Sequence, residues 1–265
     1  MKKKLLALSL VAAMAVGVFA GCSSSEEPAE TTEGTEEGAE ATGEKYIIAT
    51  DTVFPPFEFT NEDGDFVGID VDIINAIAED QGIDVEIQSL GFDAALLAVQ
   101  SGQADGVIAG MSITDERKQS FDFSEPYFDA DVTMAVAKGS DVKSYEDLAG
   151  KTVAVKTATN GADFAKSIAD EYGFTVVEFK DSPTMYQDVI AGNTAACFED
   201  YPVMAYNIQQ GAELEIPEGA TAAGTQYGFA VAKGQNAELL EKFNTGLANI
   251  KENGKFQEIV DTYTK

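Results

Sequence analysis

The stretches AALLAVQSGQADGVIAG (residues 94–110) and QDVIAGNTAACFED (residues 187–200) can be laid over each other. Each is typical of a helix end, a glycine turn and a short apolar strand. On this overlay Gly110 and Asp200 are equivalent, and each lies just beyond its strand. The pattern therefore predicts two lobes built on one plan, whose strands point their carboxyl ends at a shared crevice, where open α/β sheets bind ligands.

From residue 45 onward the chain alternates short β-rich runs with helical ones, which favours α/β layering with largely parallel sheets. Strands are expected at residues 46–49, 85–88, 106–109, 152–155, 175–179 and 195–198, and helices at residues 93–101, 161–172, 184–191 and within 236–263. Isoleucines at helical spacing predict a further helix, with Asp70 as a good N-cap and Gly82 at its end.

The expected fold class is α/β, with two lobes and the ligand cleft between them. The chain turns back through residues 226–231, so the C-terminus is expected to complete the first lobe. The first lobe is assigned residues 45–126 and 228–265, the second lobe residues 132–222, and the hinge residues 127–131 and 223–227.

The first 22 residues have the order of a secretory signal: three lysines, an apolar run from Leu5 to Ala20, and then Gly21-Cys22. The apolar run is too short for a comfortable transmembrane span. The end of this leader resembles the lipobox of bacterial lipoproteins, whose cysteine is diacylated. Residues 1–21 are therefore predicted to be a signal peptide and Cys22 a lipidation site. A disulfide between Cys22 and Cys197 is the alternative.

The segment from Cys22 to Glu44 is predicted to be a flexible tether. Residues 23–44 contain eight glutamates and no lysine, and they are otherwise mainly small and polar. Such a composition cannot bury enough apolar surface to fold. Cys197 lies in an apolar stretch, where a small thiol is ordinary core filler, and no chemistry is assigned to it.

Composition excludes several classes of function. The formal net charge is −29, with 46 acidic and 17 basic residues, and so negative a surface repels nucleic acid. The chain has no histidine, which removes Ser-His-Asp and Cys-His chemistry and the commonest zinc ligand. No catalytic residue, cofactor or metal site is predicted; the acidic stretch 61–65 is read as a polar hairpin turn instead of a calcium loop.

Arg117 is the only arginine in the chain, although sixteen lysines are present. One interpretation is a composition bias with one chance survivor. The other is a site that needs the planar guanidinium, which grips a carboxylate with two parallel hydrogen bonds.

A set of motifs carries a family resemblance. The motifs are ATD (49–51), FPPFEF (54–59), GIDVD (68–72), AGMSITDER (109–117) and FDFSEPY (121–127). In order and spacing they resemble bacterial solute-binding proteins for polar amino acids, which serve ABC importers, over residues 45–265. The resemblance implies a type II periplasmic-binding fold that closes around one amino acid. It also implies an arginine for the α-carboxylate and an aspartate for the α-ammonium.

By this resemblance Arg117 takes the carboxylate position, and backbone N–H groups near Asn160 are expected to assist. Asp200 takes the ammonium position, with the Gly110 carbonyl and the Ser112 hydroxyl as further acceptors. In the alternative, Asp200 merely caps the helix that opens at Pro202.

Two phenylalanines, Phe54 and Phe92, match the aromatic walls that enclose the ligand side chain in the family. An apolar slot with few polar anchors is typical of such pockets. Either ring could instead be simple core.

Asp51 and Lys156 match the positions that face the distal group of the ligand in the glutamine-binding member. A carboxylate accepts from an amide NH₂ and an ammonium donates to an amide oxygen, so together they would read a glutamine side chain. The alternative for Lys156 is a surface lysine paired with an acidic neighbour. Glu199 stands where the glutamine binder has histidine, and its carboxylate could shift preference toward a cationic ligand.

The favoured function is capture of a polar amino acid by a monomeric lipoprotein that delivers it to an ABC permease. Glutamine is the favoured ligand. The protein would sit on the extracellular face of the cell membrane, or on the periplasmic side if the source has an outer membrane. Binding of arginine, lysine or histidine in the same role is the alternative. A dehydratase or a signalling receptor subunit on the same fold is more remote, and the chain is not expected to be an enzyme.

Overall fold

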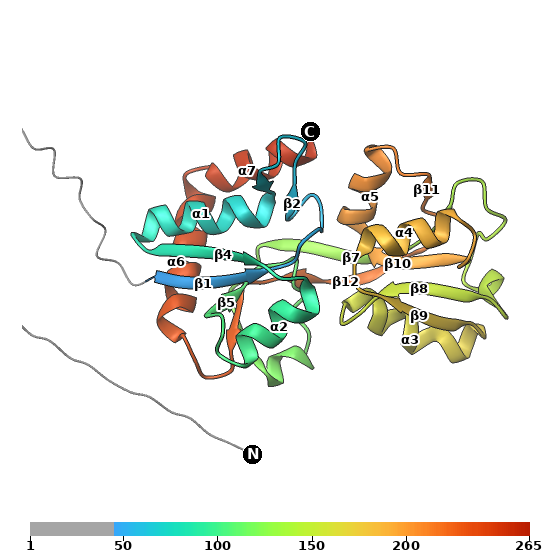
Figure 1. Ribbon diagram of the computed structural model, residues 1–265, viewed down its shortest axis with the longest axis horizontal. Helices are drawn as coiled ribbons and strands as arrows, with labels where there is room; N and C mark the ends of the chain where they lie inside the picture. The colour runs from blue at the N-terminus through green and yellow to red at the C-terminus, as the bar shows by residue number, and fades with distance from the viewer. Residues whose placement is uncertain (1–44) are drawn as a thin grey trace, which may run out of the picture. The chain divides into compact units, whose positions relative to one another are not determined.

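The computed structural model describes residues 45–265 (Figure 1). The predicted signal peptide, the Cys22 lipidation site and the acidic segment up to Glu44 lie outside the described residues. Within residues 45–265, no helix is both long and apolar enough to cross a membrane.

The first lobe is built on a five-stranded sheet in the order β4-β1-β5-β13-β6. Its strands are β1 (Lys45–Thr50), β4 (Asp84–Ser89), β5 (Gly106–Val107), β6 (Phe121–Phe123) and β13 (Ala230–Ala232). β1 runs parallel to β4 and β5, and β13 is antiparallel to β5 and β6. β13, from the end of the chain, lies between β5 and β6 in this sheet.

Helices cover both faces of this sheet (Figure 1). α1 (Ile69–Gln81), α6 (Ala237–Glu252) and α7 (Lys255–Thr264) lie on one face, and α2 (Phe92–Gln100) lies on the other. Adjacent strand residues point to opposite faces, so Ile48 packs in the cluster with α1 and Ala49 in the cluster with α2.

The helix predicted around Asp70 forms, but Asp70 is not its N-cap. α1 begins at Ile69, and Gly68 occupies the cap position with φ 141°. A Cβ on Gly68 would lie 2.1 Å from the backbone oxygen of Phe57, so only glycine permits this approach. Asp70 is fully buried inside the first turn and turns its carboxylate to other partners. The predicted end is correct, because Gly82 adopts the left-handed conformation.

The second lobe is built on a sheet in the order β11-β7-β10-β8-β9, with β12 paired to β7. Its strands are β7 (Phe128–Ala137), β8 (Thr152–Lys156), β9 (Thr175–Phe179), β10 (Ala196–Asp200), β11 (Leu214–Glu215) and β12 (Thr221–Tyr227). β8, β9 and β10 are parallel, whereas β11, β10 and β12 are each antiparallel to β7.

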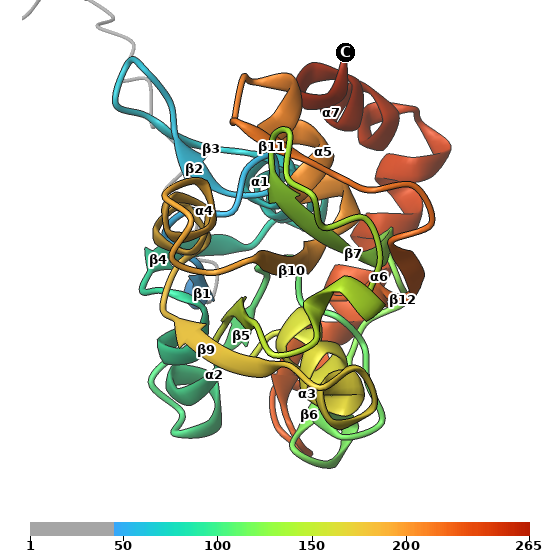
Figure 2. The same ribbon diagram turned by 90° about the vertical axis from the view of Figure 1, so that its right-hand side faces the viewer.

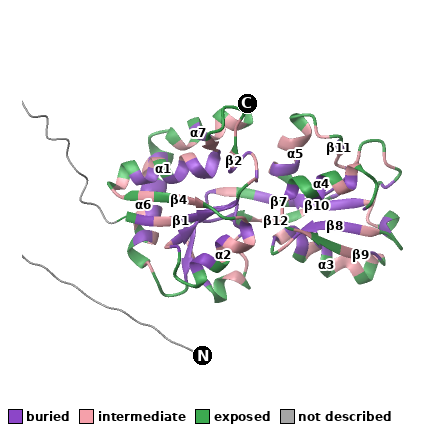
Figure 3. Cartoon of the chain, in the orientation of Figure 1, coloured by how far each residue is buried: buried purple, intermediate pink, exposed green. Residues whose placement is uncertain are grey.

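Helices again flank both faces of the second sheet, as Figure 2 shows. α3 (Asn160–Tyr172) packs on the face that carries Phe198, and α4 (Ser182–Ile190) and α5 (Tyr201–Gln209) pack on the face that carries Cys197. β10, the middle strand, is buried throughout, and the outer helix faces are exposed (Figure 3). Cys197 is fully buried, as expected of core filler, and burial raises the pKa of its thiol.

The two stretches that match in the sequence, residues 94–110 and 187–200, also have matching glycine conformations in the structure. Gly102 and Gly192, which it matches, have φ of 73° and 76° and end the turns that follow α2 and α4. The strand predicted at residues 106–109 is shorter than expected, because only Gly106 and Val107 pair regularly before the chain bends at Gly110, whose φ is 51°. α4 starts earlier than predicted, since Asp181 caps it by accepting from the Thr184 N–H at 2.8 Å.

The remaining elements are short. β2 (Phe59–Thr60) and β3 (Phe66–Val67) form a hairpin, and two 3₁₀ turns cover Arg117–Gln119 and Glu146–Leu148. The carboxamide oxygen of Asn61 accepts from the N–H groups of Asp63 and Asp65, which confirms the polar turn. Two connections join the lobes: the end of β6 to β7, and β12 to β13. They lie together, because the Tyr127 N–H donates to the Tyr227 carbonyl at 2.9 Å.

Candidate ligand-binding site

A small cavity lies between the two lobes. Its lining residues are Phe54, Phe92, Ala109, Gly110, Ser112, Arg117, Lys156, Thr159, Asn160 and Asp200. Residues up to Arg117 come from the first lobe and the rest from the second. Eight of the ten residues singled out from the sequence therefore line one cavity, while Asp51 and Glu199 are not among its lining residues.

Arg117 bridges the lobes. Its Nη1 donates to the Ser112 carbonyl and its Nη2 to the Ala158 carbonyl, each at 2.8 Å, and its Cζ lies 5.4 Å from the centre of the Phe92 ring. Burial lowers the pKa of Arg117, and the charge of Asp200 opposes that shift. A guanidinium has five N–H groups, and these two contacts use two of them, so the group retains donors for a carboxylate.

Asp200 ends β10 with its carboxylate buried at the cavity wall. Oδ2 accepts from the Tyr227 hydroxyl at 2.5 Å, and Oδ1 has no hydrogen-bond partner among residues 45–265. Burial raises the pKa of Asp200 to about 7, and the charge of Glu199 adds to this effect. Asp200 occupies the N-cap position of α5, but its side chain makes no capping hydrogen bond to that helix. Asp200 therefore places an unpartnered hydrogen-bond acceptor, Oδ1, at the cavity wall.

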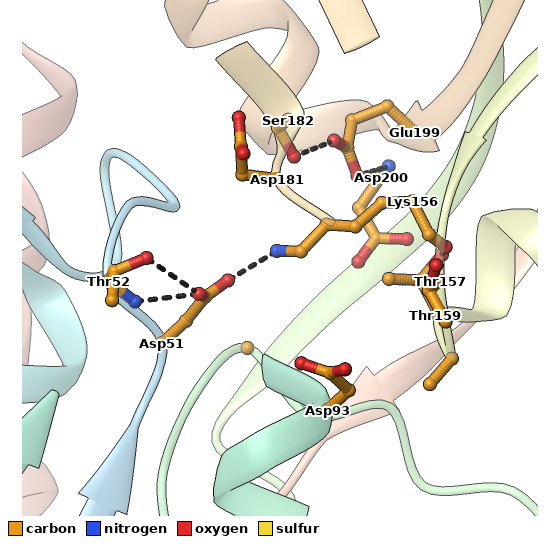
Figure 4. Close-up of polar contacts among 12 residues, drawn as sticks. Asp51, Thr52, Asp93, Lys156, Thr157, Thr159, Asp181, Ser182, Glu199 and Asp200 are labelled. Atoms are coloured by element: carbon orange, nitrogen blue, oxygen red, sulfur yellow. Dashed lines mark hydrogen bonds and ion pairs between the residues drawn. The ribbon is translucent and has the colours of Figure 1, made fainter. Parts of the chain in front are cut away.

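Lys156 and Asp51 form a buried ion pair that joins the lobes (Figure 4). Only 2% of the Lys156 side chain and 1% of the Asp51 side chain are exposed, so the surface-lysine alternative is wrong. The ammonium lies 4.2 Å from the centre of the Phe54 ring and 5.6 Å from that of Phe92. The Thr52 N–H donates to Asp51 Oδ1 at 2.6 Å and fixes that carboxylate. A buried pair of this kind places a strong donor and a strong acceptor side by side.

The aromatic side chains and Gly110 depend on each other. Phe54 and Phe92 are both buried and line the cavity. A Cβ on Gly110 would lie 2.7 Å from the Phe54 ring, and the φ of 51° at this residue is one that L side chains rarely adopt. Glycine at 110 is therefore what lets Phe54 form its wall.

The N-terminus of α3 closes the cavity on the second lobe. Thr159 is the N-cap: its hydroxyl accepts from the Ala162 N–H at 3.2 Å and donates to the Lys156 carbonyl at 2.7 Å. Asn160 opens the helix, and a helix start is favourable for an anion. Ala158, directly before the cap, takes a positive φ of 63°. The sequence reasoning missed Thr159 because it began the helix at Gly161; a threonine three residues before Ala162 is the capping signal that would have found it.

Glu199 is buried on the face of β10 that carries α4 (Figure 4). Its Oε2 accepts from the Ser182 hydroxyl at 2.6 Å and the Tyr186 hydroxyl at 3.0 Å, and its Oε1 accepts from the Asp200 N–H at 3.0 Å. The carboxylate thus has three donors and is not part of the cavity wall. Neither Ser182 nor Tyr186 could be linked to Glu199 from the sequence, because they come from a separate helix.

No cluster of side chains suited to hold a metal ion occurs within the described range 45–265. Two further acids, Glu58 and Asp70, are fully buried and were not among the predicted site residues. The cavity combines a guanidinium, an unpartnered carboxylate oxygen, a lysine–aspartate pair and two aromatic rings, which together suit a small zwitterion with a polar side chain.

Comparison with known proteins agrees with this geometry. The model of the bacterial extracellular solute-binding proteins, family 3, matches residues 46–265. The arginine-binding extracellular protein ArtP of Bacillus subtilis is 32% identical over 263 residues, which cover 98% of this chain and 96% of that protein.

Solved structures are similar as well. Substrate-binding domain 2 of Lactococcus lactis GlnP, in an open conformation, is 47% identical with a TM-score of 0.59, and the match covers 84% of this chain and 96% of that domain. An ancestral arginine-binding protein bound to glutamine is 40% identical with a TM-score of 0.77, and the match covers 83% and 97% of the two chains. The chain belongs to the bacterial extracellular solute-binding proteins, family 3.

Proposed function

We propose that the protein is the substrate-binding component of an ABC import system, which captures a polar L-amino acid, glutamine first, and hands it to a membrane permease. The observation that carries the proposal is the buried, unpartnered Oδ1 of Asp200 in the same small cavity as the guanidinium of Arg117. An acceptor without a donor is costly in a protein interior unless a ligand supplies one.

The two charges complement an amino-acid backbone. Asp200 would accept from the α-ammonium together with the Gly110 carbonyl and the Ser112 hydroxyl. Arg117 would donate to the α-carboxylate, with N–H groups at the start of α3 near Asn160 as further donors. A molecule that carries only one of the two charges would leave the other site group unpaired, so the cavity selects zwitterions.

The buried ion pair supports glutamine as the side chain. Lys156 would donate to the side-chain amide oxygen and Asp51 would accept from the amide NH₂, while Phe54 and Phe92 would enclose the methylenes. A cationic side chain in this place would meet the ammonium of Lys156, and like charges at close range are unfavourable. Glu199, which could have favoured a cation, is instead bonded to Ser182 and Tyr186 of α4. Asp51, by contrast, adjoins the cavity through its pair with Lys156, which lines it.

A basic amino acid remains the second candidate. ArtP of Bacillus subtilis, which is 32% identical, is named as arginine-binding, and two similar structures of ancestral arginine-binding proteins were solved, one with arginine and one with glutamine. The chemistry of Lys156 and the relatives thus favour different side chains, and direct titration decides between them.

The decisive experiment is isothermal titration of the purified protein with each of the twenty L-amino acids. Glutamine should bind with a Kd below about 100 µM, which corresponds to roughly −5.5 kcal/mol, and more tightly than arginine. Tighter binding of arginine would establish the second candidate. If none of the twenty bound in that range, the proposed function would be wrong. The matched control is Asp200→Asn, which keeps the shape of the side chain and should abolish binding of the ligand that wild type takes.

Closure of the cavity is proposed to occur by rotation of the first lobe (45–126 and 228–265) against the second (132–222). The crossings at 127–131 and 223–227 would serve as the hinge. The TM-scores support a closed arrangement, because the chain resembles ligand-bound proteins at 0.77 to 0.78 and an open domain of higher identity at 0.59. Small-angle scattering with and without ligand would test the motion in solution.

Lipid anchoring is proposed for the N-terminus: cleavage after residue 21, a diacylated Cys22 and a tether to Glu44 would hold a monomer at the outer face of the membrane. Mass spectrometry of the mature N-terminal peptide tests this directly. A free Cys22 thiol in protein from the native membrane would contradict it. The relatives named above are named for the small molecules they bind, which supports a role in ligand binding rather than in catalysis or nucleic-acid binding.

A further inference from the structure

Two acidic side chains, Glu58 and Asp70, are fully buried in the interior of the first lobe. Glu58 pairs through its backbone with Phe54, whose N–H donates to the Glu58 carbonyl at 2.7 Å. Asp70 lies in the first turn of α1. The Asp70 N–H donates to the carbonyl of Phe57, the residue next to Glu58, at 2.9 Å, and each carboxyl group affects the pKa of the other.

The two carboxyl groups together have too few donors for both to be ionised. Both side-chain oxygens of Glu58, and Oδ1 of Asp70, have no other hydrogen-bond donor among residues 45–265. Two ionised carboxylates in contact without donors would be strongly unfavourable in a protein interior. A single shared hydrogen removes both the repulsion and the unmet acceptors.

The surroundings indicate which residue carries that hydrogen. Asp70 Oδ2 already accepts from the Gly110 N–H at 2.7 Å and from the Tyr127 hydroxyl at 2.8 Å, so it is stabilised as the anion. Burial raises the pKa of Asp70 to about 7 in spite of these donors. Burial, followed by the charges of Asp70 and Asp51, raises the pKa of Glu58 well above its usual range, and only Lys156 opposes this.

Asp70 accepts hydrogen bonds from Gly110 at the ligand cavity and from Tyr127 at the crossing between the lobes. Gly110 lines the ligand cavity, and its position is what admits the Phe54 ring. Tyr127 lies at the crossing between the lobes, where its N–H donates to the Tyr227 carbonyl. The orientation of one buried carboxylate therefore fixes the cavity backbone and the start of the crossing together.

We propose that Glu58 is a neutral carboxylic acid that donates its hydroxyl hydrogen to Asp70, and that this hydrogen bond positions Asp70 to hold Gly110 in the ligand cavity. Glu58 is thus a positioning residue, and its effect on ligand affinity rests on the function proposed above. An ionised Glu58 would repel Asp51 and compete with it for Lys156. In its neutral form Glu58 leaves Lys156 to Asp51 and to the ligand.

The first test needs no ligand. In protein labelled with ¹³C at the glutamate side-chain carboxyl, one glutamate should remain protonated at pH 7, and its signal should be missing in Glu58→Gln. The exposed glutamates should titrate near their ordinary pKa of about 4.3. If every glutamate titrated in that ordinary range, Glu58 would be a carboxylate and the proposal would be wrong.

The second test is ligand affinity at pH 7 in two variants of similar size. Glu58→Leu cannot donate and should weaken binding about tenfold, whereas Glu58→Gln keeps an N–H donor toward Asp70 and should restore most of the affinity. Equal losses in the two variants, or none in Glu58→Leu, would contradict the positioning role. Glu62→Leu, in the exposed hairpin turn, is the matched control and should bind like wild type.

The two tests separate the two proposals. If no amino acid binds the wild-type protein, the proposed function is wrong, yet the carbon titration still establishes or refutes a neutral Glu58. If Glu58→Leu fails to fold, the titration of wild type and the affinity of Glu58→Gln remain decisive. Loss of binding in a folded Glu58→Gln protein would show that binding requires the ionised form of Glu58, which would contradict the proposal.

Discussion

The Tyr227 hydroxyl donates to Oδ2 of Asp200 at 2.5 Å, while Oδ1 of the same carboxylate has no partner among residues 45–265. Tyr227 ends β12, at the crossing between the lobes, and Asp200 ends β10. The hydroxyl thus fixes the orientation of the carboxylate and helps to keep it ionised inside the protein, since a donor to the charged form lowers the cost of burying it.

Tyr227→Phe should therefore weaken amino-acid binding by about 1–2 kcal/mol, because Asp200 loses the donor that orients it. Isothermal titration measures the change. Tyr145→Phe is the matched control, since it removes a hydroxyl that donates to the Ala220 carbonyl in the second lobe, and it should leave affinity unchanged. Equal losses in the two variants would indicate a general effect of removing a hydroxyl.

Affinity should fall as pH decreases below about 7. Burial and the charge of Glu199 raise the pKa of Asp200 to about 7, although the charges of Arg117 and Lys156 lower it. Only the ionised form of Asp200 attracts the ligand ammonium. Below that pKa each pH unit costs roughly 1.4 kcal/mol, or about tenfold in Kd. Titrations from pH 5 to pH 8 check this, and a Kd independent of pH over that range would exclude Asp200 as the ammonium partner.

Arg117→Lys should weaken binding at least about tenfold, because lysine cannot reproduce a planar fork that serves two carbonyls and a carboxylate at once. The neighbouring Lys118 pairs with Asp115 at the surface, and Lys118→Ala should have almost no effect. Affinity and melting temperature are measured together, so that loss of the contact to Ala158 is distinguished from unfolding. Retained affinity in Arg117→Lys would show that the fork is not needed.

Lys156→Ala should cost about 1–3 kcal/mol of glutamine affinity, as for the loss of a hydrogen bond from a charged donor. It should also narrow the preference for glutamine over arginine, since the cation that repels a basic side chain is gone. Competition titrations with both amino acids measure the ratio. Lys166→Ala, which breaks an exposed pair with Glu178, is the control.

The sequence predicted the fold in detail because its local signals agree with the tertiary packing. Residues Thr175–Phe179 form the strand expected of them, and α1 ends at its glycine. The errors have local causes. Asp70 reads as a good cap, but the close approach of Gly68 to Phe57 starts the helix earlier and buries the acid.

The cavity was predictable to the extent that its residues follow strand ends and known motifs. Glu199 illustrates the limit. Neighbouring strand residues point to opposite faces, so Glu199 and Asp200 cannot both meet one ligand easily, and α4 supplies Glu199 with Ser182 and Tyr186. The burial of Glu58 had no signal in the sequence, because glutamate is almost never buried without a partner, and its partner lies twelve residues away on a separate helix.

The ion pair between Asp51 and Lys156 has a kinetic consequence. Its two members belong to different lobes and have almost no contact with water. A molecule held in the adjoining cavity can depart only after this pair has separated and both charges have been hydrated. The dissociation rate would then report how often the lobes part, and side chains of different size would leave at similar speeds even where their affinities differ.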